Sequence, residues 1–386
     1  MKKIKKNLSW IFVFLFLILV FKNWFWKGVI SSGDAPFWFS EAIKKFPSFP
    51  FLWSESGLGG YQAVLGHFFY FIFLPKFLSF FNLSWGWIER ICFYWLFLTL
   101  GAFSSWYLAK TVIPRCEFKF LSVLIYLFNT YILMIVSGGQ VSIFLAYAIA
   151  PLVLGLFINL LTSSRVKELK NLIIAGVVLS LQVGFEPRIT LITMMAFGFY
   201  CLFYINQLKS LKVWLRLIFS VLIAFFLHFY WIFPSLVLRK SPFSSEVIAS
   251  DWVSFLSFAN FSNTFSLLHP FWPENIFGKT YFMKPEFLFL PILAFISLLF
   301  IENLDSLRAK KNILFFGLLA IIGSFLSKGI NLPLGEVYRW LFNNVPGMNL
   351  FRDPTKFYIL LALSYSVLIP FSVEKIYLYL RKKFDN

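Results

Sequence analysis

The apolar run "VLGHFFYFIFLPKFLSFF" at residues 64–81 decides the fold of this chain, because its path determines on which side of a membrane every later loop lies. His67, Pro75 and Lys76 interrupt the run, so hydropathy alone does not tell whether it crosses. A membrane is expected because 59% of the 386 residues are hydrophobic and only 13% are charged, which is not a soluble composition. The chain is therefore predicted to be all-α, a polytopic transmembrane helical bundle that forms one integral membrane domain over residues 1–386.

Other apolar runs predict about ten membrane spans. A helix needs roughly 20 apolar residues to cross the bilayer core, and shorter runs suffice where aromatic residues anchor the ends. The first run follows a basic head and lacks a small-residue cleavage site, so it is predicted to remain as a helix. The predicted spans are 8–26, 88–108, 118–136, 141–161, 169–185, 189–205, 213–233, 287–301, 313–326 and 357–379.

Charge settles the path of residues 64–81, since short cytoplasmic connections carry an excess of Lys and Arg. If the run does not cross, the inner side holds 20 Lys and Arg against 6 Asp and Glu, and the outer side holds 15 against 11. If it crossed, every later basic connection would lie outside. We therefore expect an outer-leaflet interfacial or re-entrant element at 64–81, and both termini in the cytoplasm of a multi-pass cell-membrane protein.

This topology places the three long loops, 27–61, 234–286 and 327–356, on the outer face, where function is expected. The net charge of +18 does not indicate nucleic acid, because the charges lie between spans. The three cysteines and three histidines show no metal-ligand spacing, so no metal and no cofactor is favoured, although a divalent ion held by Asp34 and another outer acid stays open. Besides Asp34, the candidate substrate-binding residues are Arg352, Lys356, Asp353, Glu55, Arg188 and His67.

Asp34 has two interpretations. It follows the first span and lies between Gly33 and Pro36, so a stiff turn would hold its carboxylate near the bilayer surface. There it could act as a general base that accepts a proton from an attacking hydroxyl. Local sequence favours the simpler role, an N-cap of a helix that starts at Pro36. The two roles can coexist.

Two further clusters carry charge at predicted outer helix ends. In "NLFRDPTKFYILLALSY", residues 349–365, Arg352 and Lys356 could hold a lipid phosphate, or they could anchor the helix end while Arg352 pairs with Asp353. Asp353 is also a candidate N-cap. In "GFEPRIT", residues 184–190, Glu186 and Arg188 are expected to pair, since charges at that depth are costly alone. Contact of Arg188 with substrate remains the alternative.

Several motifs together resemble GT-C membrane glycosyltransferases, most closely the arabinofuranosyltransferase-like and YfhO-like membrane proteins. These motifs are "SGDAPFWF" at 32–39, "PSFPFLWSESGLGGYQ" at 47–62, "YLFNTYILMIVSGGQVSIFLAYAIAPLVLGLF" at 126–157 and "FRDPTKF" at 351–357. The resemblance implies a GT-C-like fold with Asp34 at the catalytic-base position. It also implies a polyprenyl-phosphate sugar as donor, a glycan or lipid as acceptor, and cations such as Arg352 and Lys356 on the leaving phosphate.

Two other classes of protein remain open. A lipid or glycan transporter or flippase would also be polytopic, but it usually has ionisable groups near the bilayer midplane, paired repeats or broken helices; His228 is the nearest candidate. A non-catalytic membrane assembly protein would need no specific acid. The chain ends shortly after Tyr379, whereas many GT-C proteins continue, so a shortened or inactive relative is a further alternative.

Overall fold

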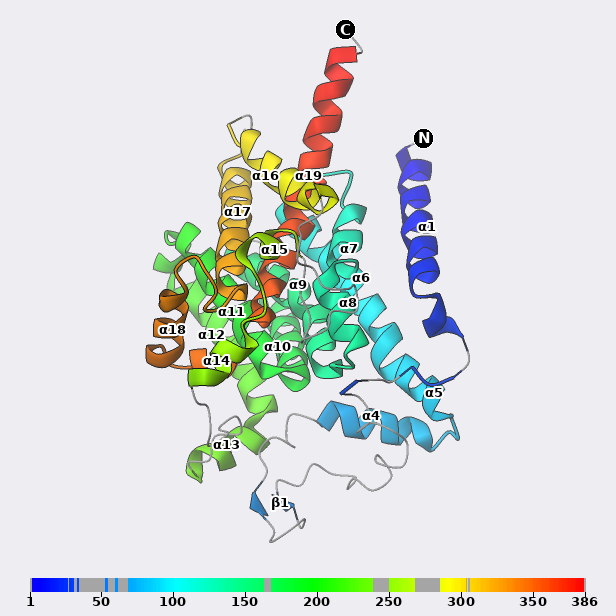
Figure 1. The fold of residues 1–386 in the computed structure, drawn as a ribbon, viewed down its shortest axis with the longest axis vertical. Coiled ribbons are helices and arrows are strands. Elements are labelled where there is room, and N and C mark those ends of the chain that lie inside the picture. Colours follow the sequence, from blue (N-terminus) through cyan, green and yellow to red (C-terminus); the bar gives the residue numbers. More distant parts are fainter. Residues whose placement is uncertain are drawn as a thin grey trace.

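The structure, a computed structural model, is a helical bundle whose two termini lie at the same end (Figure 1). It describes residues 2–26, 28–30, 33–34, 53–54, 60–61, 69–162, 168–238, 250–267, 285–302, 304 and 306–384. One short antiparallel pair, β1 (Trp53–Ser54) with β2 (Gly60–Tyr61), departs from the all-α prediction and lies in the predicted first outer loop. We call the end that holds both termini the terminal end and the opposite end, with α4 and α13, the loop end.

Most of the described residues lie in helices. Residues 327–356, predicted as a loop, contain helical segments of their own, α18, η6 and η7. The helices are α1 (Lys2–Val20), η1 (Lys22–Phe25), α4 (Phe69–Ser79), α5 (Trp85–Glu89), η3 (Arg90–Tyr94), α6 (Trp95–Val112), α7 (Phe120–Leu127), α8 (Thr130–Ser137), α9 (Val141–Thr162), α10 (Glu168–Phe185), α11 (Pro187–Phe203), η4 (Gln207–Lys209), α12 (Leu211–Leu227), α13 (Phe229–Val237), α14 (Ser250–Leu256), α15 (Phe261–Phe265), η5 (Pro285–Leu288), α16 (Phe289–Leu299), α17 (Leu307–Ser327), α18 (Gly335–Asn344), η6 (Met348–Phe351), η7 (Pro354–Phe357) and α19 (Tyr358–Phe384).

Four helical stretches are long and apolar enough to cross a membrane: Trp85–Val112, Val141–Thr162, Leu307–Ser327 and Pro354–Phe384. The count rises to six if the bent pairs α7 with α8 and α12 with α13 each form one span. This agrees with a multi-pass membrane protein. Each remaining predicted span coincides with a shorter apolar helix, namely Ser9–Val20, Leu169–Phe185, Pro187–Phe203 and Pro285–Leu299. Whether these four also cross stays a prediction.

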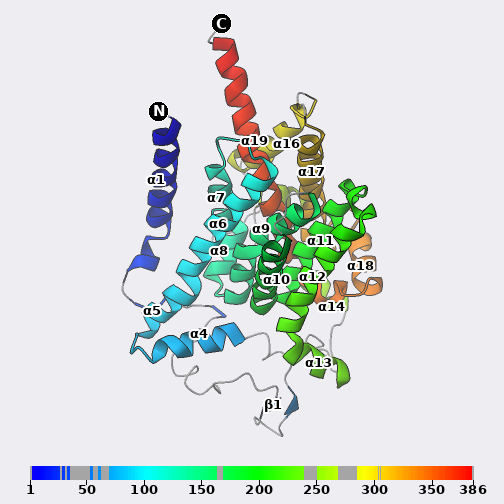
Figure 2. The same cartoon turned by 180° about the vertical axis from the view of Figure 1, so that it is seen from behind.

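Helix α4 carries the described part of the run that decides the topology. Its 11 residues include Pro75 and rise about 16 Å, roughly half of the thickness of a hydrocarbon core. The helix lies across the loop end of the bundle, whereas α1 runs along the long axis of the molecule (Figures 1 and 2). Both its length and its direction support the interfacial prediction for this part of residues 64–81.

Helices α9 and α19 form the centre of the bundle. Both are apolar on every side, and 89% of the most apolar window of each is buried by protein. Helices α6, α10 and α11 surround α9, while α7, α16 and α17 pack on α19. Glycines allow the closest approaches: a Cβ added at Gly323 of α17 would lie 2.8 Å from the Cβ of Leu360 of α19.

Two predicted spans are bent rather than straight. Between α7 and α8 the axis turns by 51°, and Asn129 at the break accepts a hydrogen bond from the backbone N–H of Ile132 (3.1 Å), which starts a new helix. Between α12 and α13 the axis turns by 80° at His228. The His228 ring lies 2.8 Å from the carbonyl of Ser180 and accepts a bond from the Trp231 indole, so it has a structural role.

We expect labelling of single cysteines to establish which end faces outward. Ser84→Cys, at the loop end before α5, should react with a membrane-impermeant maleimide in intact cells, because it is exposed and follows the helix that is predicted to be interfacial. Gln207→Cys, exposed in η4 after the fifth apolar segment that follows Ser84, should react only after permeabilisation. A Cys201→Ser background removes the half-buried native thiol.

An N-terminal epitope tag supplies the control for residues 64–81 in the same cells. The tag should be protected in intact cells together with Gln207→Cys. Detection of the tag on the same side as Ser84→Cys would mean that residues 64–81 cross the membrane.

Candidate functional site

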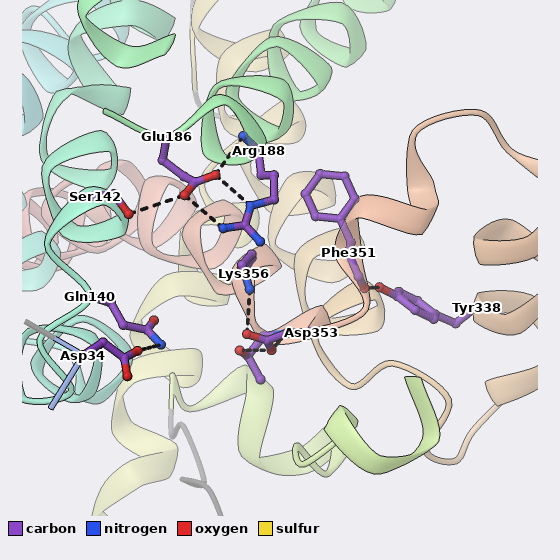
Figure 3. Close-up of polar contacts among 10 residues, drawn as sticks. Asp34, Gln140, Ser142, Glu186, Arg188, Tyr338, Phe351, Asp353 and Lys356 are labelled. Atoms are coloured by element: carbon purple, nitrogen blue, oxygen red, sulfur yellow. Dashed lines mark hydrogen bonds and ion pairs between the residues drawn. The ribbon is translucent and has the colours of Figure 1, made fainter. Parts of the chain in front are cut away.

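Asp34 is held at the loop end by main-chain contacts with the turn between α8 and α9. Its backbone N–H donates to the carbonyl oxygen of Gly138 (2.9 Å). Gly33 has a φ of +61°, and a Cβ added there would lie 2.2 Å from the same oxygen, so only glycine fits. The exposed carboxylate of Asp34 accepts a long hydrogen bond from the Gln140 side chain (3.4 Å), as Figure 3 shows.

The first turn of α9 connects Asp34 to the α10–α11 junction. Gln140 immediately precedes α9, and Ser142 lies two residues later. The Ser142 hydroxyl donates to the Glu186 carboxylate at 3.4 Å. Gln140 and Ser142 were not predicted as site residues, although they belong to a polar turn between two apolar runs, "SGGQVS" at residues 137–142, which is a signal in the sequence.

Glu186 and Arg188 form the predicted ion pair. Glu186 alone separates α10 from α11, and its carboxylate caps α11 by accepting from the Arg188 backbone N–H (3.3 Å). The guanidinium of Arg188 binds the same carboxylate through Nε (2.7 Å) and Nη2 (3.0 Å). The Glu186 side chain is 4% exposed and that of Arg188 is 30% exposed, so the pair is shielded from water without being closed off.

Asp353 and Lys356 form a second pair just before α19. Asp353 is the predicted N-cap, since its carboxylate accepts from the backbone N–H of Thr355 (3.1 Å), and it binds the Lys356 ammonium at 2.7 Å. The observed partner of Asp353 is therefore Lys356 rather than Arg352, whose side chain is exposed at the end of η6. Asp353 also acts electrostatically on Arg188, so the two pairs belong to one cluster (Figure 3).

Neighbouring elements fix the second pair in place. The Tyr338 hydroxyl of α18 donates to the carbonyl of Phe351 (2.8 Å), which holds the segment that leads to Asp353. Lys328 is buried in the turn after α17 and donates to the carbonyl of Asn331 at 2.6 Å. It was not predicted as a site residue. Burial lowers the pKa of the Lys328 ammonium, because desolvation disfavours its charged form.

Residues from four distant parts of the chain thus lie in one row at the loop end. Hydrogen bonds and ion pairs join Asp34 to Gln140, Ser142 to Glu186 and Glu186 to Arg188, and the Asp353–Lys356 pair lies beside Arg188 (Figure 3). Within the described residues Asp34 makes no hydrogen bond or ion pair with Lys356. Among those residues there is also no cluster of His, Cys, Asp and Glu that could hold a metal ion. Two predicted site residues, Glu55 and His67, and the helix proposed to start at Pro36, lie outside the described residues.

A cavity of about 580 Å³ opens next to Asp34. It lies between the end of α1, η1, η3 and α8, and its lining side chains are mostly apolar, although the wall exposes polar and apolar surface in about equal parts. Ser137 on its wall directly precedes Gly138, the residue that holds Asp34. The cavity is lined by Val20, Phe21, Asn23, Trp24, Trp26, Val29, Ile30, Arg90, Tyr94, Leu133, Val136 and Ser137.

The polar wall of this cavity is set by Arg90. Its guanidinium donates to the carbonyls of Trp24 (3.0 Å) and Gly28 (2.6 Å) and lies 3.5 Å from the Glu89 carboxylate. Arg90 therefore joins the chain after α1 to the start of α6, and its charge is compensated by those oxygens. The cavity thus offers an apolar wall beside a neutralised polar one.

Comparison with known proteins finds no protein family, no curated protein and no solved structure that matches this chain. The GT-C resemblance therefore remains a prediction from short sequence motifs.

We expect Glu186→Gln to lower the free energy of unfolding by about 2 kcal/mol, because it leaves Arg188 half-buried without its bidentate carboxylate partner. A fall in the thermal unfolding midpoint of the purified protein in detergent measures the effect. The matched control is Glu336→Gln, which breaks the exposed pair with Arg339 on α18 and should cost less than about 1 kcal/mol. Equal midpoints for the two variants would contradict a structural role for the buried pair.

Proposed function

We propose that this protein is a membrane glycosyltransferase of the GT-C type. In this proposal the ten apolar segments cross the cell membrane, both termini are cytoplasmic and the loop end faces outward. The donor is a polyprenyl-phosphate-linked sugar, and the acceptor is a glycan or lipid of the cell envelope. No nucleotide sugar, cofactor or metal is part of the proposed reaction.

The position of Asp34 carries the proposal. Its carboxylate is exposed, yet its backbone is fixed to Gly138 beside a charge cluster built from three other helix ends. A carboxylate that served only to cap the helix after it would not need this attachment to a distant turn. A fixed, solvent-accessible acid at a membrane face is the arrangement that general-base catalysis on a lipid-linked substrate requires.

The proposed reaction is a displacement at the anomeric carbon of the donor sugar. Asp34 accepts the proton of an acceptor hydroxyl, and the hydroxyl oxygen forms the new bond to the anomeric carbon. The bond between that carbon and the phosphate oxygen breaks, and polyprenyl phosphate leaves with the electron pair. The proton stays on Asp34 until it is lost to water from the exposed carboxyl.

Cations of the cluster would stabilise the leaving phosphate. Arg188 uses two of its nitrogens on Glu186, and its Nη1 makes no hydrogen bond within the described residues. Lys356 donates one of its three protons to Asp353. Each pair therefore keeps donors available while its carboxylate holds the cation in place. The exposed Arg352 adds a further cation at the same helix end.

The cavity beside Asp34 suits the lipid part of such a donor. Its wall is formed largely by aromatic and aliphatic side chains between α1 and α8, at the loop-end termini of apolar helices. A polyprenyl chain is apolar throughout, so it can lie against this wall while its phosphate reaches polar groups. The cavity and the row of charged residues share the turn at Ser137 to Gln140.

One observation favours a transporter as the second candidate. The bends of 51° at Asn129 and 80° at His228 are interrupted apolar helices, which are a frequent feature of transporters. Almost no broken helices were predicted from the sequence. His228 is bonded to Ser180 and Trp231, so at this bend the ionisable group is already engaged by the protein.

Asp34→Asn should lower glycosyl transfer by about a hundredfold or more, because the amide cannot accept the proton of the attacking hydroxyl. The assay uses purified protein in proteoliposomes with radiolabelled polyprenyl-phosphate mannose, glucose or arabinofuranose and membrane glycans as acceptor. Glu336→Gln, an exposed change on α18, is the control and should keep wild-type transfer. Equal transfer by Asp34→Asn and wild type would exclude Asp34 as the base. Movement of the labelled lipid across the bilayer without transfer would favour the transporter.

Gly33→Ala should lower transfer about tenfold with little change in the unfolding midpoint, because its methyl group collides with the Gly138 carbonyl and displaces Asp34. Gly28→Ala is the matched control, since Gly28 also has a positive φ, +110°, but open space where the methyl group would lie. If both variants lost the same activity, backbone strain rather than the position of Asp34 would be responsible.

A further inference from the structure

A second large cavity, of about 750 Å³, lies at the terminal end, opposite the candidate site. We call it the basic pocket. Its wall combines the last turn of α6, the turn that follows it, the first turns of α17 and the middle of α19. The lining includes Lys110 and Arg115 on one side, and Arg308, Glu374 and Lys375 on the other.

Among the residues that the structure describes, the basic pocket has an excess of positive charge. It holds four cations, Lys110, Arg115, Arg308 and Lys375, and one carboxylate, Glu374. That carboxylate already accepts a bond from the backbone N–H of Glu117 (3.1 Å). Within the described residues none of the four cations forms an ion pair. At the loop end, by contrast, Arg188 and Lys356 each have a carboxylate partner.

Contacts with residues in and beside the pocket hold three of its four cations in place. Arg308 donates to the Thr162 hydroxyl at 2.9 Å, and the Lys110 ammonium lies 5.0 Å from the centre of the Trp106 ring. Lys375 lies 5.5 Å from the ring of Phe371. Aromatic and hydroxyl partners orient these charges but do not neutralise them, so an anion in the pocket would gain from all four.

The remaining lining separates into a polar and an apolar part. Asn159 donates to the Tyr107 hydroxyl (3.0 Å), and together with Thr111 these residues offer neutral polar groups. Ile113, Phe371 and Leu378 form an apolar wall. Helices α6, α17 and α19 all belong to stretches apolar enough to cross a membrane. The pocket lies at the last turn of α6, the first turns of α17 and the point where α19 changes from apolar to charged, which is where lipid headgroups would meet the protein.

We propose that the basic pocket binds the phosphate group of an anionic membrane phospholipid. Phosphate oxygens match the Arg308 and Arg115 guanidinium forks and the two Lys ammonium groups. The apolar wall accommodates the start of the acyl chains. A bound headgroup would join α6, α17 and α19 at the terminal end. This site is independent of the proposed glycosyl transfer.

The experiment measures lipid-dependent thermal stability of the purified full chain. Protein in phosphatidylcholine nanodiscs is compared with protein in nanodiscs that contain increasing fractions of phosphatidylglycerol. The wild type should unfold at a higher temperature as the anionic lipid increases, because the lipid binds the folded state. The double change Arg308→Gln with Lys375→Gln should raise the lipid fraction needed for half-maximal protection by about fivefold for each cation removed.

The control removes the same charge elsewhere at the terminal end. Lys382→Gln with Lys383→Gln acts on the exposed last turn of α19, outside the pocket, and should leave the protection unchanged. An equal loss of protection in both double variants would overturn the proposal, since only general attraction to an anionic surface would remain. A second double variant serves if Arg308→Gln with Lys375→Gln does not fold. It is Lys110→Gln with Arg115→Gln, which changes two exposed positions of the opposite wall and should reduce the protection in the same way.

A third arm separates the lipid from a free ion. Millimolar inorganic phosphate is added to protein in phosphatidylcholine nanodiscs and should give less protection than phosphatidylglycerol, because it makes no contact with the apolar wall. Equal protection by inorganic phosphate would overturn the assignment to a lipid.

Discussion

The burial of α9 and α19 is the constraint on which the rest of the structure depends. A helix that is enclosed by protein over most of its length presents no face to lipid, so six neighbouring helices, α6, α7, α10, α11, α16 and α17, have to pack around the two. Side-chain volume at the crossings then fixes the position of each end. Gln140 and Ser142 at the start of α9, and Lys356 before α19, are brought to one face by this packing. The candidate site is thus a consequence of how the core is built.

Much of the helical framework follows from the sequence, because apolar runs in a membrane have few alternatives to a helix. Each predicted span coincides with a described helix or a bent pair, and the N-cap at Asp353 was predicted from the acid directly before Pro354. Glu186 was predicted only as the partner of Arg188, although it stands in the same way before Pro187 and caps α11. The bends at Asn129 and His228 were not visible. The bends depend on tertiary contacts between residues far apart in the sequence. His228 and Ser180, for example, are about fifty residues apart.

The site itself was only partly accessible from the sequence. Composition and charge located it at the outer loops and selected Asp34, Arg188, Asp353 and Lys356. The ion-pair partner of Asp353 could not be assigned from the sequence, because cations stand at both 352 and 356. The structure shows that Lys356, in η7, binds the Asp353 carboxylate. Gln140 and the buried Lys328 belong to turns whose role depends on what packs against them. Glu55 and His67 stay predictions.

The candidate site at the loop end and the basic pocket at the terminal end differ in their balance of acidic and basic side chains. Among the described residues of the row and the helix end beside it, three acids, Asp34, Glu186 and Asp353, accompany three bases, Arg188, Arg352 and Lys356, so their formal charges balance. Such a cluster can hold a substrate through directed hydrogen bonds without attracting every anion nearby. The basic pocket at the terminal end keeps an excess of cations, which suits a ligand that is permanently anionic.

The attachment of Gly33 and Asp34 to Gly138 is made by main chain on main chain. The hydrogen bond involves no side chain, so it does not depend on which side chains follow in the first loop. In the proposed transferase, the reacting carboxylate would then be positioned separately from the part of the loop that recognises the acceptor. A lineage of such proteins could exchange the recognition part for another acceptor, or an engineer could graft a different segment there, while the reacting group kept its place.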